Sequence, residues 1–199
     1  DVVHTGDRFV VFGTEGTDRN ADPTRAWSSR DGFHWTALDT TAIGKWDPED
    51  GVVLNSGVEL FADAFSVYDL LPETDVFNSL IKPSERPVTG LATDGVGAVL
   101  VTRTGWKYWS LDGSNWTHSE QEQNEAALED VAFGNGLYVA VGRGQRSMVS
   151  SDGGRTWTET RSHNGSTPHP HNCGPYIDWC DVDFLNGVFV MYDRSGEGG

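Results

Sequence analysis

The stretch Leu128 to Thr160, LEDVAFGNGLYVAVGRGQRSMVSSDGGRTWTET, decides the fold of this chain of 199 residues. Apolar residues alternate on both sides of Gly134-Asn135-Gly136, a short polar turn of the kind that joins two antiparallel strands. A third run, 147–151, turns at Asp152-Gly153-Gly154 into a fourth run, 156–160. The stretch therefore predicts four short antiparallel strands, a unit that can bury its apolar face only against copies of itself.

Copies of this unit recur along the chain. The hairpin pattern begins at Val2, Val52, Leu91, Val131 and Val182. The turn before the fourth strand recurs in three copies, from Ser29 to Trp35, from Ser110 to Trp116 and from Ser150 to Trp157. The copy that begins at Val52 lacks this turn, but its runs 65–71 and 76–81 are expected to form outer strands. A period of about forty residues with four strands per unit resembles a β-propeller blade.

The recurring turn, Ser-x-Asp-x-Gly-x-x-Trp, resembles the Asp-box (BNR) repeat of the sialidase-like β-propellers. Only the third copy has the full spacing, and the other two are one residue shorter between Asp and Trp. The resemblance implies a structural turn whose carboxylate holds backbone N–H groups and whose Trp packs between strands. We expect this role rather than a chemical one, because Asp in turns commonly bonds its own backbone. The residues concerned are Ser29, Asp31, Trp35, Ser110, Asp112, Trp116, Ser150, Asp152, Gly154 and Trp157.

The predicted fold is an all-β propeller of four-stranded antiparallel blades, with about four and a half blades in this chain. It is a single propeller domain or part of a larger one. The repeats are expected at about 1–41, 42–82, 83–120, 121–160 and 178–199, with a long loop at 161–180. The fifth copy stops after its second strand, which would leave an unpaired strand edge. We expect that the remainder is missing, or that a second chain or further copies of this one complete the propeller.

Composition and net charge limit the fold class and the classes of partner. The 24 Gly and the absence of a long helical period are typical of an all-β domain rich in turns. The net charge of -16 argues against nucleic acid, whose phosphates would be repelled. No apolar run approaches the length needed to span a membrane. The chain begins without Met or a signal peptide, so we interpret it as a processed or trimmed product.

The two cysteines, Cys173 and Cys180, lie in one loop. In an exported protein they are expected to form a disulfide, with a metal pair or free thiols as the alternatives. This interpretation favours a secreted, periplasmic or cell-surface location.

Acidic residues precede the first strand of several copies. Asp1, Asp130 and Asp181 occupy the same position, and Asp50 is one residue out of register. First strands are innermost in a propeller, so these carboxylates would surround the mouth of the central channel. Converging carboxylates raise one another's pKa or attract a cation such as Ca²⁺. Alternatively, each carboxylate bonds the backbone of a neighbouring blade.

Arginine follows the second strand at matching positions, as Arg103, Arg143 and Arg194. Three guanidinium groups on one face would suit a carboxylate or sulfate, because Arg binds such groups through a planar fork. The alternative is a clamp in which each Arg pairs with an Asp of the acidic ring.

The resemblance also suggests an enzyme, because sialidases grip the substrate carboxylate with an arginine triad. The candidates for catalysis are Asp50, Asp130, Asp181 and Tyr192. However, the family's Phe/Tyr-Arg-Ile-Pro motif is absent, the nearest string being Ser84-Glu85-Arg86-Pro87, and no Tyr-Glu nucleophile pair can be assigned.

Two further sets of side chains lie in or near the loops of the same face. His163, His169 and His171 have a spacing that could chelate Zn²⁺ or Cu²⁺, although solvated imidazoles in a Pro-rich loop are the ordinary alternative. The aromatic set could stack on sugar or belong to the core, and consists of Trp46, Trp106 and Trp179.

The functional hypothesis is an exported or cell-surface propeller that binds a glycan or another surface partner. One alternative is a sialidase-like glycoside hydrolase or polysaccharide lyase acting on acidic sugars. Another is an assembly subunit whose incomplete blade is completed by another chain through strand addition.

Overall fold

The structure is a computed structural model that describes residues 2–5, 8–14, 24–43, 48, 50–71, 75–83, 87–119, 127–143, 146–161 and 179–193. These residues form antiparallel strands joined by turns, and none of them is helical. A helix that could cross a membrane is accordingly not found in this part of the chain.

The strands form five sheets, which we call blades 1 to 5, and within each sheet every strand pairs with the next along the chain. Blade 1 consists of β1 (Val2–His4), β2 (Phe9–Thr14), β3 (Thr24–Ser29) and β4 (Thr36–Ala37). Blade 2 consists of β5 (Asp50–Val53), β6 (Glu59–Ala62), β7 (Val67–Leu71) and β8 (Val76–Ile81). Blade 3 consists of β9 (Val88–Thr93), β10 (Ala98–Thr102), β11 (Lys107–Ser110) and β12 (Trp116–His118). Blade 4 consists of β13 (Leu128–Gly134), β14 (Leu137–Gly142), β15 (Arg146–Ser150) and β16 (Thr158–Arg161). Blade 5 consists of β17 (Trp179–Leu185) and β18 (Val188–Asp193).

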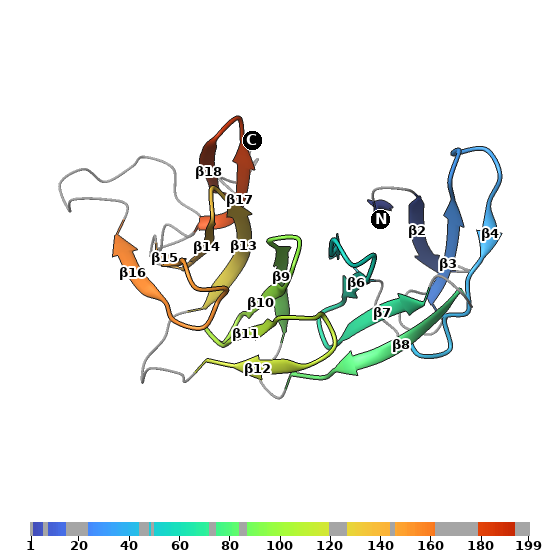
Figure 1. Cartoon of the computed structure of the whole chain (residues 1–199), viewed down its shortest axis with the longest axis horizontal. Coiled ribbons are helices and arrows are strands. Elements are labelled where there is room, and N and C mark those ends of the chain that lie inside the picture. The colour runs from blue at the N-terminus through green and yellow to red at the C-terminus, as the bar shows by residue number, and fades with distance from the viewer. Residues whose placement is uncertain are drawn as a thin grey trace, which may run out of the picture.

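The blades stand side by side along an open arc (Figure 1). Their first strands lie on the inner side, where β5, β9, β13 and β17 pack against one another in turn. Blades 1 and 5 stand at the two ends of the arc, with a gap between them (Figure 1). The four-stranded antiparallel blades predicted from the sequence are therefore confirmed, including the two outer strands of the copy without an Asp-box.

Two hairpin turns show why the copies fold alike. Asn135 and Gly136 have φ angles of 49° and 78°, and Asn186 and Gly187 have φ angles of 52° and 86°. Positive φ at both central residues is the backbone of a two-residue hairpin turn, and Asn-Gly is the pair that adopts it most readily. The same dipeptide thus fixes the pairing of β13 with β14 and of β17 with β18.

The Asp-box turns hold the third strand to the fourth. The Asp112 carboxylate accepts the backbone N–H groups two and three residues later, at 2.9 and 2.7 Å. The Trp116 indole N–H donates to a backbone carbonyl of the same turn at 3.0 Å. The turn at Asp31 repeats these bonds, and in the longer turn at Asp152 the carboxylate accepts the N–H groups three and four residues later. Hydrogen bonds from the backbone lower the pKa of Asp31 and of Asp112, so both stay ionised at neutral pH.

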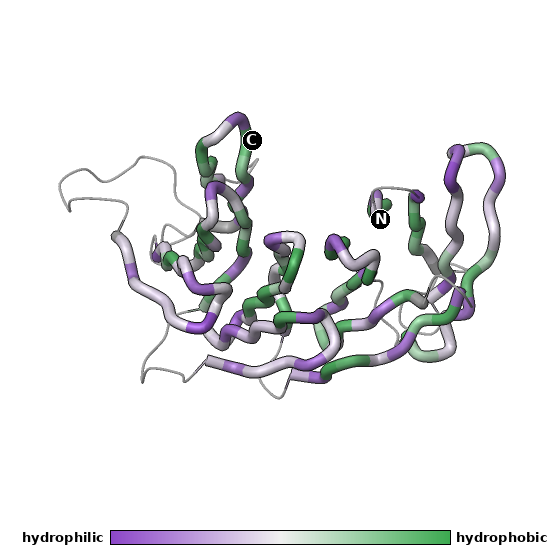
Figure 2. The backbone as a smooth tube through the Cα atoms, in the orientation of Figure 1, coloured by the Kyte–Doolittle hydropathy of each residue, from purple (hydrophilic) through white to green (hydrophobic). Residues whose placement is uncertain are grey.

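The core lies between blades rather than within them. The rings of Phe12 in blade 1 and of Phe61 and Phe77 in blade 2 have centroids 5.5 to 5.8 Å apart. Similar apolar clusters join blades 2 and 3, blades 3 and 4, and blades 4 and 5. Hydrophobic residues follow the strands of every blade, whereas polar residues mark many of the turns (Figure 2). Each interface holds because burial of one such side chain is worth about 1.5–3 kcal/mol.

A buried ionic cluster also joins blades 1 and 2. The Arg8 guanidinium donates from Nε to both oxygens of Glu59, at 3.1 and 3.0 Å, and from Nη1 to Asp75 at 3.1 Å. The Thr5 hydroxyl donates to the same Glu59 carboxylate at 2.8 Å. The Arg8 and Glu59 side chains are both buried, so each supplies the charge that the other needs there.

Candidate functional site

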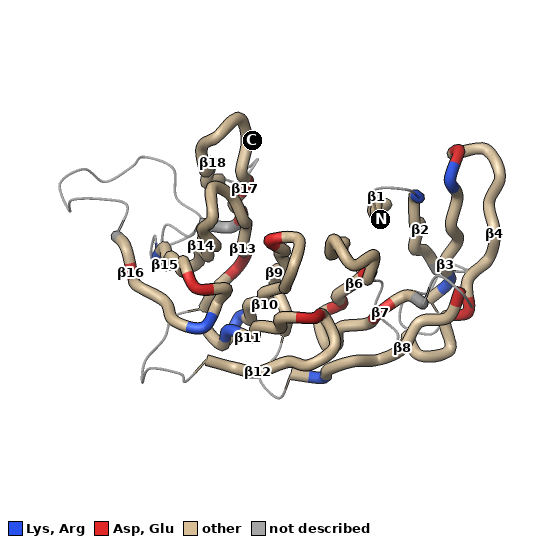
Figure 3. Tube along the Cα trace, in the orientation of Figure 1, with Lys and Arg blue, Asp and Glu red and all other residues tan. Residues whose placement is uncertain are grey.

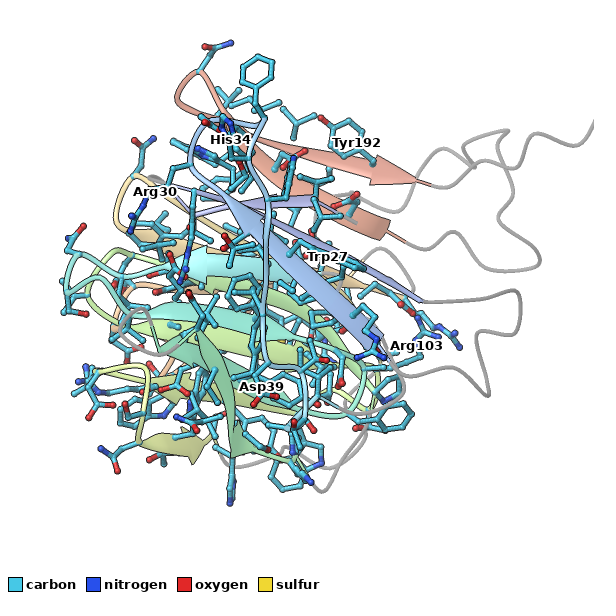
Figure 4. All side chains as sticks on the ribbon, turned by 90° about the vertical axis from the view of Figure 1, so that its right-hand side faces the viewer. Trp27, Arg30, His34, Asp39, Arg103 and Tyr192 are labelled. Atoms are coloured by element: carbon cyan, nitrogen blue, oxygen red, sulfur yellow. The ribbon has the colours of Figure 1, made fainter. Side chains whose placement is uncertain are left out.

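A cavity of about 530 Å³ lies where the first strands of blades 2 to 5 begin. It opens on the face that carries the connection between second and third strands. Figure 4 shows Arg103 of this face at the opposite end of the molecule from Arg30 and His34 of an Asp-box turn. The charged residues that line the cavity are Asp50, Asp63, Arg103, Glu129, Asp130, Arg143 and Asp181.

Two acids at the base of the cavity bind the backbone of the next blade. The Asp50 carboxylate accepts the Leu91 N–H of blade 3 at 2.7 Å. The Asp130 carboxylate accepts the Val182 N–H of blade 5 at 2.8 Å. Leu91 and Val182 occupy equivalent positions in their copies, so the same contact is made at two interfaces. This is the backbone contact that we considered as the alternative to a cation site.

Burial and neighbouring charge keep these acids from ionising normally. Burial and, to a smaller extent, a hydrogen bond with the Asp181 carboxyl together raise the pKa of Asp130 to about 8, despite the backbone N–H groups that lower it. Burial likewise raises the pKa of Asp50, and the charge of Asp181 adds to the effect. The Asp181 side chain is exposed. Asp130 therefore holds a proton at pH 7, hydrogen-bonded between blades 4 and 5.

Blade 3 departs from the pattern because glycine replaces the acid. Gly90 occupies the position of Asp130, and a Cβ built on Gly90 would lie 2.6 Å from the Asp130 Oδ1. A side chain would therefore collide with the acid of blade 4. The hydroxyl of Thr89 instead donates to the Leu128 carbonyl at 2.9 Å and joins the two blades.

The structure gives no support to the predicted metal sites within the residues it describes. No group of three His, Cys, Asp or Glu side chains in that part of the chain is placed to hold a metal ion. At the acidic ring, oxygens of Asp50 and Asp130 are engaged by amide N–H groups. Three residues of the predictions, Asp1 of the ring and Cys173 and Arg194, lie outside the described residues, as do His163, His169 and His171.

Two aligned arginines meet at one carboxylate on the rim of the cavity. Arg103 donates from Nη2 to Glu129 Oε2 at 3.1 Å, and Arg143 donates from Nε to Glu129 Oε1 at 3.2 Å. The side chains of Arg103 and Arg143 are 52% and 55% exposed, whereas Glu129 is 14% exposed. The carboxylate thus holds two guanidinium groups side by side while leaving about half of each in solvent.

Sequence reasoning missed Glu129. It lies at a β-bulge, where the pairing of β13 with β14 shifts register between Leu128 and Asp130. A bulge redirects a side chain that strict alternation would place elsewhere. The register of β9 and of β17 also shifts near the start of the strand, and the sequence offers no signal for such a shift.

Other predicted residues do not line the cavity. Trp106 packs against Tyr108 and His118, with a ring-centroid distance of 5.0 Å to His118, at the edge of the cluster between blades 2 and 3. Tyr192 lies on the outer face of β18 and is 41% exposed (Figure 4). The side chains of Trp179 and Cys180, at the start of β17, and the whole of Trp46 lie outside the described part.

The charges of the site separate into two layers. The guanidinium groups of Arg103 and Arg143 lie at the rim, and Asp50 and Asp130 lie below them. Both acids accept backbone N–H groups, and the raised pKa of Asp130 favours its protonated form. Elsewhere, acidic residues are spread along the arc rather than gathered at one end (Figure 3). The rim is thus a place where an otherwise acidic protein presents positive charge.

Comparison with known proteins identifies the fold and nothing narrower. No protein-family model matches the chain, and no curated protein sequence matches it. Among solved structures, YCF48 from Cyanidioschyzon merolae has a TM-score of 0.61 at 14% identity, with 96% of this chain and 63% of that one covered. The extracellular domain of the hybrid two-component system BT4673 from B. thetaiotaomicron has a TM-score of 0.63 at 13% identity, with 92% of this chain and 24% of that one covered.

A structure of YCF48 bound to D1 peptide is also similar, with a TM-score of 0.55 at 12% identity over 80% of this chain and 51% of that one. This chain therefore spans less than two thirds of the length of each of these structures. At such identities the likeness establishes only a β-propeller fold, matched over part of the length of those structures. The assignment to the Asp-box, sialidase-like propellers stays a prediction.

Proposed function

We propose that this chain is a binding module that holds a carboxylate group of a surface partner at the cavity rim, through Arg103 and Arg143. The observation that carries the proposal is their shared contact with Glu129, which places two half-exposed guanidinium groups side by side. Each guanidinium presents its N–H donors in a planar fork, which suits it to bind a carboxylate bidentately.

The acids below the rim need not repel such a ligand. Asp130 carries a proton at neutral pH, and the pKa of Asp50 is also raised by burial. Their effective negative charge is therefore smaller than the count of carboxyl groups suggests. Glu129 is neutralised by the two arginines that it holds.

The ligand class is an acidic glycan or an acidic segment of a polypeptide, which share the carboxylate. The similarity to the structure of YCF48 bound to D1 peptide supports a polypeptide, since it is a propeller of related shape with a peptide ligand. The likeness to the extracellular domain of BT4673 supports an exported or cell-surface location. If so, Cys173 and Cys180 should resist thiol labelling until they are reduced.

The geometry does not favour the hydrolase alternative. A retaining glycosidase needs two carboxyl groups about 5–5.5 Å apart and an inverting one needs a wider gap. The carboxyl groups of Asp130 and Asp181 are instead hydrogen-bonded to each other. Asp50 and Asp130 are also bound to backbone amides, and Tyr192 lies away from the cavity. We therefore assign no catalytic step to these residues.

Calorimetric titration with three ligands tests the proposal: an oligosaccharide of uronic acids, a sialylated oligosaccharide, and an acidic peptide with a free C-terminal carboxylate. Arg103→Ala and Arg143→Ala should each weaken binding by about 10-fold or more, because a hydrogen bond to a charged group is worth roughly 1.5–3 kcal/mol. Arg143→Lys should restore binding only in part, since Lys lacks the planar fork.

Arg155→Ala is the matched control, because Arg155 is an exposed arginine of an Asp-box turn, away from the cavity. It should change the affinity by less than twofold. Unaltered binding in the double variant Arg103→Ala with Arg143→Ala would overturn the proposed site. The melting temperature of each variant shows whether a loss of binding reflects a loss of fold.

A further inference from the structure

The face of blade 1 that points away from blade 2 is apolar but uncovered. Val2, which opens its first strand, is 65% exposed, whereas the equivalent residues Leu91 and Val131 are each 4% exposed. Leu91 belongs to the cluster between blades 2 and 3, and Val131 to the cluster between blades 3 and 4. In both blades this position is therefore buried by the preceding blade.

The third strand of blade 1 shows the same difference. Trp27 lies two residues before the Asp-box serine and is 36% exposed (Figure 4). The equivalent residues, Tyr108 in blade 3 and Met148 in blade 4, are 5% and 4% exposed and pack in the clusters with the preceding blade. A Trp at this position is a large apolar side chain without the cover that its counterparts receive.

The Asp-box turn of blade 1 also lacks a counterpart. A Cβ on Gly113 of blade 3 would lie 3.2 Å from Val58 of blade 2, and one on Gly154 of blade 4 would collide with Val99 of blade 3. A Cβ on Gly32, the equivalent glycine of blade 1, would meet nothing within 4 Å. Gly32 has a positive φ of 75°, which by itself favours glycine, but among the described residues no blade packs against it as blades 2 and 3 pack against its counterparts.

The opposite end of the arc presents the complementary face. Tyr192 of blade 5 is 41% exposed, whereas Val101 and Val141, at the equivalent positions of blades 3 and 4, are fully buried. Val188, on the same face of β18, is 58% exposed. Among the described strands, β18 pairs only with β17, so its outer edge has no described partner. Such an edge and face are suited to the addition of further strands.

We propose that both open faces are covered by further blades of the same propeller ring, which add strands to β18 and close against blade 1. The repeated interfaces define the chemistry of this occupant. Its last blade presents an apolar face to Val2, Trp27 and Gly32, and its first strand carries an acid that accepts the Val2 N–H, as Asp50 and Asp130 do for Leu91 and Val182. Asp181 is the acid that would do the same for the blade that follows blade 5.

The extent of the arc favours added blades over a second copy. Nearly the whole chain, 96%, is matched by YCF48 but covers only 63% of that chain, so the rest of that chain has room for fewer blades than this chain has. A second copy would bring another set of five sheets, which exceeds that room. The inference concerns the two ends of the arc and does not depend on the proposed carboxylate site.

Hydroxyl-radical footprinting, performed on the protein in the cells that make it and on the isolated chain of 199 residues, tests the inference. In the isolated chain, Trp27 and Tyr192 should be oxidised readily. In cells their oxidation should fall to the level of the buried Tyr138, while Leu111, which is 51% exposed in blade 3 and lies away from both ends of the arc, should stay labelled. Equal labelling of Trp27 and Tyr192 in both samples would overturn the inference.

A photo-crosslinker at position 192 then identifies the occupant. The cross-linked segment should show the alternating hairpin pattern of a blade; a segment without that pattern would refute the proposal. Protection of the isolated chain that grows with concentration and doubles the particle mass would instead show a second copy, which also refutes it.

Two variants separate closure from folding. Val2→Lys should abolish the protection of Trp27 in cells without changing the melting temperature of the isolated chain, because Val2 is largely exposed there. Val96→Lys, at an equally exposed position of blade 3 away from both ends of the arc, should preserve the protection. If Val2→Lys does not fold, Val188→Lys tests the other end, where protection of Tyr192 should be lost; persistent protection would count against the proposal.

Discussion

The surroundings of Asp130 shift the pKa of its carboxyl group in opposite directions. Its carboxyl group accepts the Val182 N–H, which favours the charged form, but it is buried beside Asp181, which favours the neutral form. Burial is the larger effect and raises the pKa to about 8. The other charged groups of the cavity are the Asp50 and Asp181 carboxyls and the two rim arginines, which are paired to Glu129. The charge of Asp181 also raises the pKa of Asp50.

The pH dependence of stability follows from this raised pKa. The folded state keeps the proton of Asp130 between pH 4 and 8, whereas the unfolded state loses it near pH 4, so stability should fall as the pH rises through this window. We expect Asp130→Asn to remove most of the decline, because Asn is neutral and still offers an oxygen to Val182. At pH 8.5 the variant should exceed the wild type by ~1 kcal/mol or more in urea unfolding.

Asp50 also has a raised pKa, so a smaller slope should persist in Asp130→Asn. Asp31 and Asp112 have lowered pKa values and act in the opposite sense, since the stability they provide is lost only at strongly acidic pH. An unchanged slope between pH 5 and 8.5 in Asp130→Asn would contradict the assignment.

At the scale of elements, the Asp-box turn is a packing device as well as a local one. Its carboxylate organises the turn, and its glycine allows the preceding blade to approach closely, as Gly154 shows against Val99. The local part could be predicted from the sequence, because Asp, Gly and Trp recur at fixed spacing. The contact with the preceding blade could not, because it depends on how two sheets are placed relative to each other.

A pair of alanine substitutions separates these two contributions. Gly32 and Gly154 both have positive φ, at 75° and 85°, so Ala should cost each turn roughly 1 kcal/mol of strain. Gly154→Ala should cost at least ~1 kcal/mol more, because its Cβ would also collide with Val99, as in an overpacked core. Chemical unfolding of the isolated chain measures the difference. Equal losses in the two variants would show that the turn does not bear on the neighbouring blade.

The position of the candidate site could be predicted from the sequence, but not all of its residues. The alignment of copies brings Asp50, Asp130 and Asp181 to one end of the blades, and the structure does gather them around one cavity with Arg103 and Arg143. Their function stays a proposal. The partner of the arginines, Glu129, could not be found, because its direction is set by a bulge that strict alternation does not contain.

At the scale of the whole molecule, the described strands of each blade make their main contacts between blades with the blades next to them in the chain, as in other repeat proteins. The number and order of the blades followed from the recurrence of the hairpin. The faces that stay uncovered could not be predicted from the sequence, because exposure is a property of the assembled arc. Val2 and Leu91 occupy the same position of the repeat but differ widely in burial.

Amide hydrogen exchange should reveal this nearest-neighbour arrangement. Blades 1 and 5 each have one interface, whereas blades 3 and 4 have two, so β1, β17 and β18 should exchange faster than β10 and β14 in the isolated chain. Uniform protection across all blades would indicate a fully cooperative unit and contradict the expectation.

The cavity is bounded by residues of four successive blades, from Asp50 in blade 2 to Asp181 in blade 5. Its width therefore depends on the angles between those blades, and small changes at each interface add up along an arc whose ends are free. Closing the ring would fix those angles. Ligand affinity and ring closure should then be thermodynamically linked, so that a ligand at the arginines tightens closure by the same factor by which closure tightens the ligand.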